Sequence, residues 1–302
     1  MPRVEAASAP FSTVPGAKRI TFRGEEGVDL VGDAFGDASA PPVILLHGGG
    51  QTRHAWGNTA LAIARAGYYA ISLDGRGHGE SDWSPSGNYG IDFFIGDLKR
   101  VIAALGSMPV LIGASLGGLT ALLLEGESPG LARAVVLVDI ATSAKLDGIR
   151  RIVDFMSQKP EGYASIEEVA DAIAAYQPHR KRPTNLEGLA KNVRRGEDGR
   201  YRWHWDPKFL NRPSSPEKSP LRPARLEAAA RALTVPALLV RGKQSDVIGE
   251  EEVRQFLALA PHAEYVDVRD AGHMIAGDNN DLFTDGVLGF LDRHRSDRLG
   301  SK

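Results

Sequence analysis

A serine between glycines is the residue of this chain whose surroundings best suit a nucleophile. Gly113-Ala-Ser115-Leu-Gly117 follows an apolar run that begins at Val110, and an apolar helical stretch follows it. This order matches the G-x-S-x-G elbow, where a serine occupies a sharp strand-to-helix turn and the glycines allow close backbone packing. Because such a strained turn holds the hydroxyl clear of the sheet, we expect Ser115 to attack an electrophilic carbon.

A serine hydroxyl needs an adjacent base at neutral pH. Of the eight histidines, His273 is the best candidate, because it follows the last predicted strand, at 264–268, directly after Gly272. His262 and His294 stand in helical or surface contexts, which suit ordinary packing or solvation. We therefore expect His273 to take the proton from Ser115, the alternative being a capping or core histidine.

The base in turn needs a carboxylate that fixes its tautomer and stabilises the imidazolium. Two aspartates follow predicted strands and compete for this role. Asp246 comes after the strand at 235–240, and Asp139 ends the strand at 134–138 that follows Ser115. Either could instead cap a turn at the surface, the commonest fate of a loop aspartate.

Attack on a carbonyl also requires donors preorganised for an oxyanion. The backbone N–H of Leu116, the residue after the nucleophile, is one candidate. Glycines let a backbone approach a substrate closely, and the glycine loop His47-Gly-Gly-Gly50 predicts Gly49 as the second donor, with Gly48 and Gly50 beside the substrate. We expect His47 itself to be a structural hydrogen-bonding residue.

The elements that position these residues follow an alternating pattern of strands and helices. The predicted strands are apolar throughout, as in a parallel sheet that helices cover on both faces. Four of them end at the polar residues His47, Asp74, Ser115 and Asp139, and functional residues of such sheets gather at the carboxyl ends of the strands. The expected fold is an α/β protein with a mostly parallel central sheet. The predicted strands are 42–46, 68–73, 110–114, 134–138, 235–240 and 264–268, after a hairpin at 20–35.

The alternation is interrupted over residues 141–230, which contain helical stretches and no clear strand. We expect a core of residues 1–140 and 231–302, with residues 1–18 as a loose arm, and a helical cap at 141–230. Trp203 and Trp205 would contribute to an apolar lid over the substrate, although packing within the cap explains them equally well.

Composition and charge exclude several classes of protein. The 302 residues carry a net charge of −2, with 36 basic and 38 acidic side chains, which does not favour nucleic acid or an anionic membrane. There is no cysteine, and no His/Asp/Glu group has the spacing of metal ligands, so we expect neither a metal nor another cofactor. The first 18 residues have no apolar core of a signal peptide, and no apolar run reaches the roughly 20 residues of a membrane span, so a cytoplasmic protein is expected.

In several motifs the chain resembles the α/β-hydrolase fold superfamily. They occur in the expected order over about 250 residues, and within the superfamily the chain is similar to capped bacterial serine esterases of the mycobacterial and YbfF-type groups. The residues that carry the resemblance are Leu46-His-Gly-Gly-Gly50, Asp74-Gly-Arg-Gly-His-Gly-Glu-Ser81, Gly113-Ala-Ser-Leu-Gly-Gly118, Leu137-Val-Asp139 and Gly272-His273.

The resemblance bears on the choice of acid. The family's usual loop after the strand at 235–240 reads Gly-x-x-Asp, whereas this chain has Ser245 at that position and Asp246 one residue late. YbfF-type esterases are similar in this respect and take the acid from the preceding strand. The resemblance therefore implies Asp139 as the acid, with Asp246 as the alternative.

The resemblance and the residues together imply a serine hydrolase that cleaves a small-molecule carboxylic ester or lactone through an acyl-enzyme. A C–C bond hydrolase or a perhydrolase could use the same three residues. A ligand-binding protein without catalysis is the alternative from another class, because a fold does not fix a function. Epoxide hydrolases and haloalkane dehalogenases use an aspartate nucleophile, which Ser115 disfavours.

Overall fold

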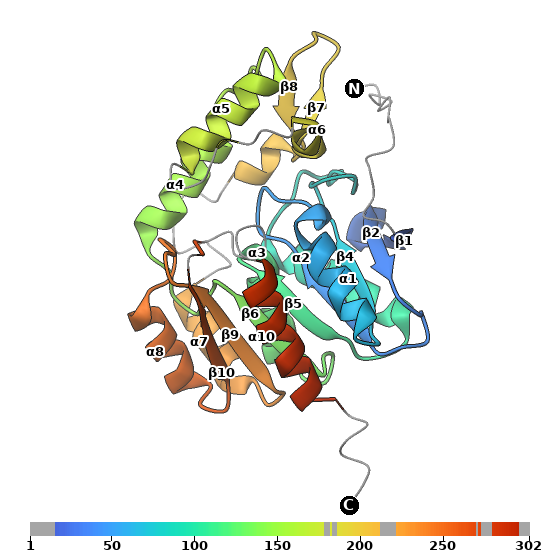
Figure 1. Ribbon diagram of the computed structural model, residues 1–302, viewed down its shortest axis with the longest axis vertical. Coiled ribbons are helices and arrows are strands. Elements are labelled where there is room, and N and C mark those ends of the chain that lie inside the picture. The colour runs from blue at the N-terminus through green and yellow to red at the C-terminus, as the bar shows by residue number, and fades with distance from the viewer. Residues whose placement is uncertain are drawn as a thin grey trace, which may run out of the picture.

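An eight-stranded sheet forms the centre of the computed structural model, which describes residues 16–177, 182, 186–211, 222–269, 271–272 and 280–295. The strands lie in the order β1-β2-β4-β3-β5-β6-β9-β10 (Figure 1). Their bounds are β1 Lys18–Arg23, β2 Asp29–Phe35, β3 Pro42–Leu46, β4 Tyr69–Leu73, β5 Val110–Ala114, β6 Ala134–Val138, β9 Ala237–Gly242 and β10 Glu264–Val268.

From β4 to β10 every neighbouring pair of strands is parallel, and β2 is antiparallel to both β1 and β4. The prediction of a mostly parallel sheet is therefore confirmed. Strands β5 and β6 are buried along their whole length, which explains why they read as continuous apolar runs. The order also places β5, which ends at Ser115, between β3 on one side and β6 on the other.

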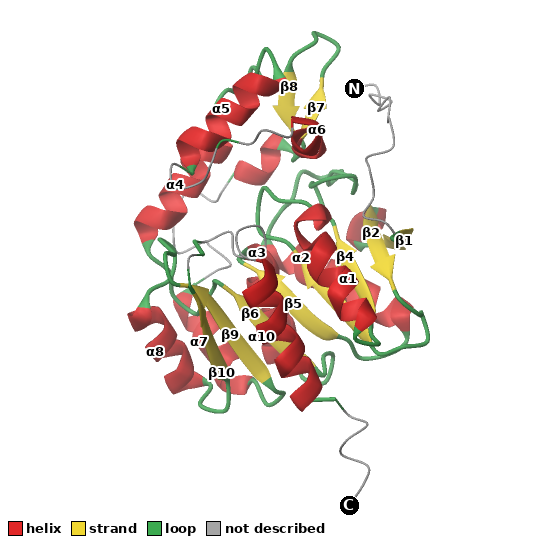
Figure 2. Ribbon diagram, in the orientation of Figure 1, coloured by secondary structure: helices red, strands yellow, loops and turns green. Residues whose placement is uncertain are grey.

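Helices cover both faces of the sheet (Figure 2). Side chains alternate between the two faces, so that Val43 and Leu45 join the hydrophobic cluster with α1 and α10, whereas Ile44 joins the cluster with α2, α3, α7 and α8. The helix bounds are α1 Gly57–Arg65, α2 Ile91–Leu105, α3 Leu116–Glu127, α7 Pro223–Ala232, α8 Glu250–Leu259 and α10 Asn280–Arg293. Among the described residues, no helix is long and apolar enough to span a membrane.

A second group of elements lies above the carboxyl edge of the sheet (Figure 1). Helix α5 begins after Ser165, whose hydroxyl accepts the Glu168 N–H, as the capping-box spacing predicts. The expectation that this segment lacks strands is wrong, because β7 and β8 form an antiparallel hairpin there. The elements are α4 Leu146–Met156, α5 Ile166–Tyr176, α6 Leu186–Leu189, β7 Val193–Arg195, β8 Tyr201–Trp203 and the 3-10 helices η3 Ala190–Asn192 and η4 Pro207–Leu210.

The end of this segment is better placed before α7 than at residue 230. Leu226, Ala229 and Ala230 of α7 belong to the same hydrophobic cluster as the sheet. A methyl group on Gly126 of α3 would lie 2.5 Å from the Ala229 carbonyl oxygen, so the two helices are in close contact. We propose that residues 141–211 act as the cap and that α7 belongs to the core.

Candidate active site

Ser115 occupies a sharp turn between β5 and α3, with φ of 46° and ψ of −113°. This conformation is strained for a residue with a side chain, and strain of this kind is typical of functional turns. The glycines permit the turn, because a methyl group on Gly113 would lie 2.4 Å from the Gly117 carbonyl, and one on Gly117 would lie 2.4 Å from the Leu46 carbonyl oxygen. The predicted elbow is therefore present, with the serine at its apex.

We expect the substitution Gly117→Ala to lower the free energy of unfolding by about 1–3 kcal/mol, because the added methyl group forces backbone apart in a packed core. Urea denaturation measures this loss. Gly286→Ala is the matched control: Gly286 lies inside α10, where a methyl group would meet only Val266 at 3.8 Å. Alanine should leave stability unchanged or raise it there. Equal losses in both variants would contradict the steric account of the elbow.

The glycine loop after β3 lies against the elbow. A methyl group on Gly48 would be 3.3 Å from Cβ of Ser115. The Gly48 N–H already donates to Oε1 of Gln51 at 2.9 Å, which favours Gly49 as the donor that this loop offers an oxyanion. Leu116 begins α3, and the first N–H groups of a helix have no partner within the helix. The two predicted oxyanion donors are thus on segments that meet at Ser115.

Asp139 follows β6 directly and is fully buried, with 0% of its surface exposed. Its φ of 51° lies in the left-handed region, which is uncommon for a residue with a side chain. Its Oδ1 accepts the Gly242 N–H at 3.1 Å, and its Oδ2 accepts the Ser245 hydroxyl at 2.5 Å. The position at which the family's usual loop carries its acid therefore holds, in this chain, a serine that hydrogen-bonds to Asp139.

Asp246 lies in a different environment. Its side chain is 42% exposed and forms an ion pair with Arg151 of α4, with Nη1 and Oδ2 3.0 Å apart. A methyl group on Gly148 of α4 would lie 2.3 Å from the Asp246 carbonyl oxygen, so α4 packs closely on this loop. Asp246 thus joins the cap to the core, and this geometry favours Asp139 as the acid.

We expect Ser245→Ala to lower kcat about 10- to 100-fold, because a hydrogen bond to a charged group contributes about 1.5–3 kcal/mol. If Ser245 positions the carboxylate, the pH dependence of kcat shifts as well, and Ser245→Thr restores it, since threonine keeps the hydroxyl. Ser39→Ala is the control, because Ser39 bonds Asp37 at 2.8 Å on an exposed turn between β2 and β3. Unchanged kinetics and an unchanged pH profile in Ser245→Ala would contradict this role.

His273, the predicted base, lies outside the described residues. The described part of the chain does contain a row of three buried histidines, His47, His78 and His204, whose rings follow one another at centroid distances of 5.1 Å and 5.9 Å. The sequence does not predict this row. Its members come from the glycine loop, the loop after β4 and the cap, so their proximity depends on the tertiary fold.

Hydrogen bonds fix the two outer histidines of this row. Nδ1–H of His47 donates to the Gly48 carbonyl at 2.7 Å, and its Nε2 accepts the Gly75 N–H at 2.9 Å. Both ring nitrogens are thereby used, in agreement with the expected structural role of His47. His204 links the cap to the core: its Nδ1 accepts the Gly79 N–H at 2.8 Å, and its Nε2 lies 3.3 Å from the Gly50 carbonyl oxygen.

Burial lowers the pKa of all three histidines. Desolvation is the main cause in each case, and the pKa of His78 falls to about 3, with the neighbouring His47 as a further cause. The row is therefore neutral at neutral pH. Neutral rings are required by the observed bonds as well, since His47 and His204 each accept a backbone N–H, which a protonated nitrogen cannot do.

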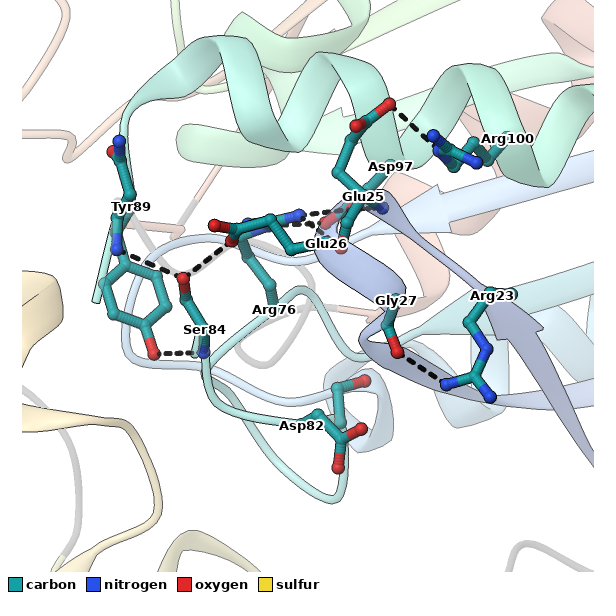
Figure 3. A network of polar contacts seen from close by, with 12 residues as sticks. Arg23, Glu25, Glu26, Gly27, Arg76, Asp82, Ser84, Tyr89, Asp97 and Arg100 are labelled. Atoms are coloured by element: carbon teal, nitrogen blue, oxygen red, sulfur yellow. Dashed lines mark hydrogen bonds and ion pairs between the residues drawn. The ribbon is translucent and has the colours of Figure 1, made fainter. Parts of the chain in front are cut away.

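Two buried arginines hold the loop after β4 in place. Arg53 forms ion pairs with Asp74 at 2.5 Å and with Asp33 at 3.1 Å. Arg76 pairs with Asp97 of α2 at 2.7 Å and with Glu26 at 3.0 Å, and Figure 3 shows these contacts beside Ser84 and Tyr89. These ion pairs hold the loop after β4 in its conformation, so we interpret the charged residues of the Asp74–Ser81 motif as structural residues.

The aromatic residues of the cap pack mainly on one another. Trp203 and Trp205 are stacked at 5.1 Å between ring centroids, and Trp205 is only 4% exposed. Trp203 also contacts Phe155 at 5.3 Å and Tyr163 at 5.5 Å. Packing therefore accounts for both tryptophans, and their contact with substrate stays a prediction.

Two other cap residues lie directly over the glycine loop. A methyl group on Gly49 would be 3.3 Å from Cζ of Phe209, and one on Gly50 would be 3.1 Å from Sδ of Met156. The sequence does not single out Phe209, because it lies in a proline-bounded stretch without helical or strand periodicity. Within the described residues, no group of three or more His, Asp or Glu side chains is arranged to hold a metal ion.

The sheet, the elbow and the buried aspartate agree with the result of comparing this sequence with models of known protein families. The model of the α/β hydrolase fold family matches residues 41–279. The chain therefore belongs to the α/β hydrolase fold family, as the motifs imply.

Particular relatives are also similar over most of their length. Esterase Rv0045c of Mycobacterium tuberculosis is 31% identical, over 84% of each chain. The 3-hydroxybutyrate-oligomer hydrolase of Cupriavidus necator is 29% identical, over 79% of this chain and 85% of the relative. A solved structure of the M. tuberculosis esterase Rv0045c, at 29% identity, superposes with a TM-score of 0.73 over 92% of this chain and 93% of the other.

Proposed function

We propose that this chain is a serine hydrolase that cleaves a carboxylic ester or lactone. The strained elbow at Ser115, enclosed by glycines that tolerate no side chain, is the observation that carries the proposal. Relatives over most of the chain are named as an esterase and as an oligomer hydrolase, which supports the same reaction class. The proposed substrate is a small molecule, since the cap closes over the glycine loop. The cytoplasmic location stays a prediction.

In the proposed reaction the Ser115 hydroxyl attacks the carbonyl carbon while His273 takes its proton. Asp139, held by the Gly242 N–H and the Ser245 hydroxyl, orients the histidine and stabilises its positive charge. The N–H groups of Leu116 and Gly49 stabilise the oxyanion of the tetrahedral intermediate. His273 then protonates the departing alcohol, and an acyl-enzyme forms on Ser115. Attack by water, with the same base, releases the acid.

Hydrolysis of a panel of p-nitrophenyl esters and lactones by the wild type and Ser115→Ala tests this proposal. We expect turnover by the wild type and a loss of several orders of magnitude in the variant. Turnover of a C–C bond or of hydrogen peroxide with no ester turnover would move the function to a C–C hydrolase or a perhydrolase. Tight ligand binding with no turnover of any kind would favour a binding protein.

A further inference from the structure

The side chain of Phe209 covers the glycine loop. Its ring lies over Gly49, the proposed oxyanion donor, so closely that a methyl group added to Gly49 would be 3.3 Å from Cζ of the ring. The same ring meets His78 edge-on at 4.6 Å between centroids and Phe94 of α2 at 6.3 Å. Phe94 in turn lines a mostly apolar cavity of about 40 Å³, together with His47 and Leu116.

The turn that carries Phe209 is tied firmly to the core. Asp206, which directly precedes η4, donates its N–H to the Gly77 carbonyl at 2.9 Å and accepts the Tyr89 hydroxyl at 2.6 Å. Its other carboxylate oxygen accepts the Lys208 N–H at 2.9 Å. Burial and the bond to Asp206 raise the pKa of Tyr89, so its hydroxyl stays a donor over the working pH range. These hydrogen bonds fix the backbone of the turn and thereby the position of Phe209 over the glycine loop.

The strand order indicates which part of an ester would contact Phe209. The base must protonate the leaving alcohol, so the alcohol lies on the side of the residues that serve the base. Asp139 follows β6, on one side of β5, and His273 follows β10 in the chain. The glycine loop follows β3, on the other side of β5. The oxyanion itself points at the N–H groups of Gly49 and Leu116. The acyl chain leaves the same carbon away from the alcohol, so in our proposal it passes along the glycine loop, where Phe209 lies over Gly49.

We infer that Phe209, held by Asp206, sets the acyl specificity and restricts the substrates to esters of short-chain acids. This inference rests on the proposed ester hydrolysis. The described aromatic neighbours of the Phe209 ring are His78, Tyr89 and Phe94, and these neutral rings favour an acyl group that is neutral and apolar. The alcohol part of the ester lies on the opposite side of Ser115, so Phe209 does not discriminate between alcohols of different length.

The experiment compares kcat/KM of the wild type and Phe209→Ala on p-nitrophenyl acetate, butyrate and octanoate. We expect the wild type to favour the acetate and butyrate, and the variant to raise the octanoate-to-acetate ratio about 10-fold or more, since each methylene that gains a pocket is worth about 10-fold or more. Phe209→Leu, a smaller change for the fold, should raise the ratio by less. In a second series, of acetyl esters of alcohols of increasing length, the dependence of kcat/KM on alcohol length should be the same in the wild type and in both variants.

Phe155→Ala is the matched control, because Phe155 is a cap aromatic that stacks on Tyr176 at 4.2 Å, within the cap. It should leave the acyl-length ratio unchanged. An unchanged ratio in both Phe209 variants, with ester turnover intact, would overturn the inference and leave the proposed function standing. A change in the alcohol series instead of the acyl series would also overturn it. Absence of ester turnover in the wild type would refute the proposed function itself.

Discussion

Asp139→Asn is expected to lower kcat by about 10⁴-fold, the loss that follows when the carboxylate of a serine–histidine–aspartate triad becomes an amide. The amide oxygen of the variant can still accept the Gly242 N–H, which keeps one of the two contacts of the buried side chain. The Ser245 hydroxyl oxygen already accepts the Val247 and Ile248 N–H groups, so its contact with the new amide group is weakened, and urea denaturation checks that the variant is folded. What is lost is the negative charge that stabilises the imidazolium, so kcat falls far more than KM changes.

Asp246→Asn is the matched comparison and is expected to leave kcat within a few-fold of the wild type. An exposed ion pair such as Asp246–Arg151 contributes about 0–1 kcal/mol, and the substitution acts on the junction of α4 with the core. Steady-state kinetics of both variants on one ester, with urea denaturation to confirm folding, separate the two aspartates. A nearly wild-type Asp139→Asn together with a loss of several orders in Asp246→Asn would reverse the assignment.

Stability is expected to fall as the pH drops below 6.5, and His78 alone accounts for about 1 kcal/mol of this loss between pH 6.5 and pH 5.5. The sign follows from the lowered pKa values of the buried histidines His47, His78 and His204. Above their ordinary pKa of 6.5, both the folded and unfolded states are neutral. Below it, the unfolded chain binds protons that the folded chain does not, which costs the folded state up to about 1.4 kcal/mol per histidine and pH unit. For His78 this loss continues down to about pH 3.

Urea denaturation at intervals between pH 7.5 and pH 5 measures this slope. His78→Phe should reduce the slope by up to about 1.4 kcal/mol per pH unit, because phenylalanine fills the contact with Phe209 and removes one proton site. His262→Gln is the control, since His262 is exposed and bonds only the Val235 carbonyl among the described contacts. A flat pH dependence of the wild type, or equal slopes in His78→Phe and the wild type, would contradict neutral burial of the row.

Much of the fold can be predicted from the sequence because the strands are continuous apolar runs that turns interrupt. Strands β3, β5, β6 and β10 have the predicted bounds. The hairpin β7–β8 is missed because its strands have three residues each, too short for an alternating pattern. The expected end of the cap falls within α7, whose alanine-rich sequence does not reveal that it packs against α3.

Some residues of the candidate site can likewise be predicted from the sequence, whereas others cannot. Ser115, Gly49 and Asp139 can be found because local motifs and strand ends indicate them. Phe209 and the contact between Ser245 and Asp139 cannot, because they depend on how loops from distant parts of the chain meet. Trp203 and Trp205 attract attention by composition, yet they pack on other cap aromatics. A large aromatic residue in a sequence says little about whether it faces a ligand or its own neighbours.

Covalent labelling of Ser115 tests the central claim most directly. A fluorophosphonate should modify the wild type once, at Ser115, as read by intact-mass and peptide mass spectrometry. The modification should be absent in Ser115→Ala, and ester turnover should disappear in proportion to the labelled fraction of the wild type. A label on another residue, or full ester turnover with Ser115 labelled or replaced, would contradict the account of this chain as a hydrolase with Ser115 as its nucleophile.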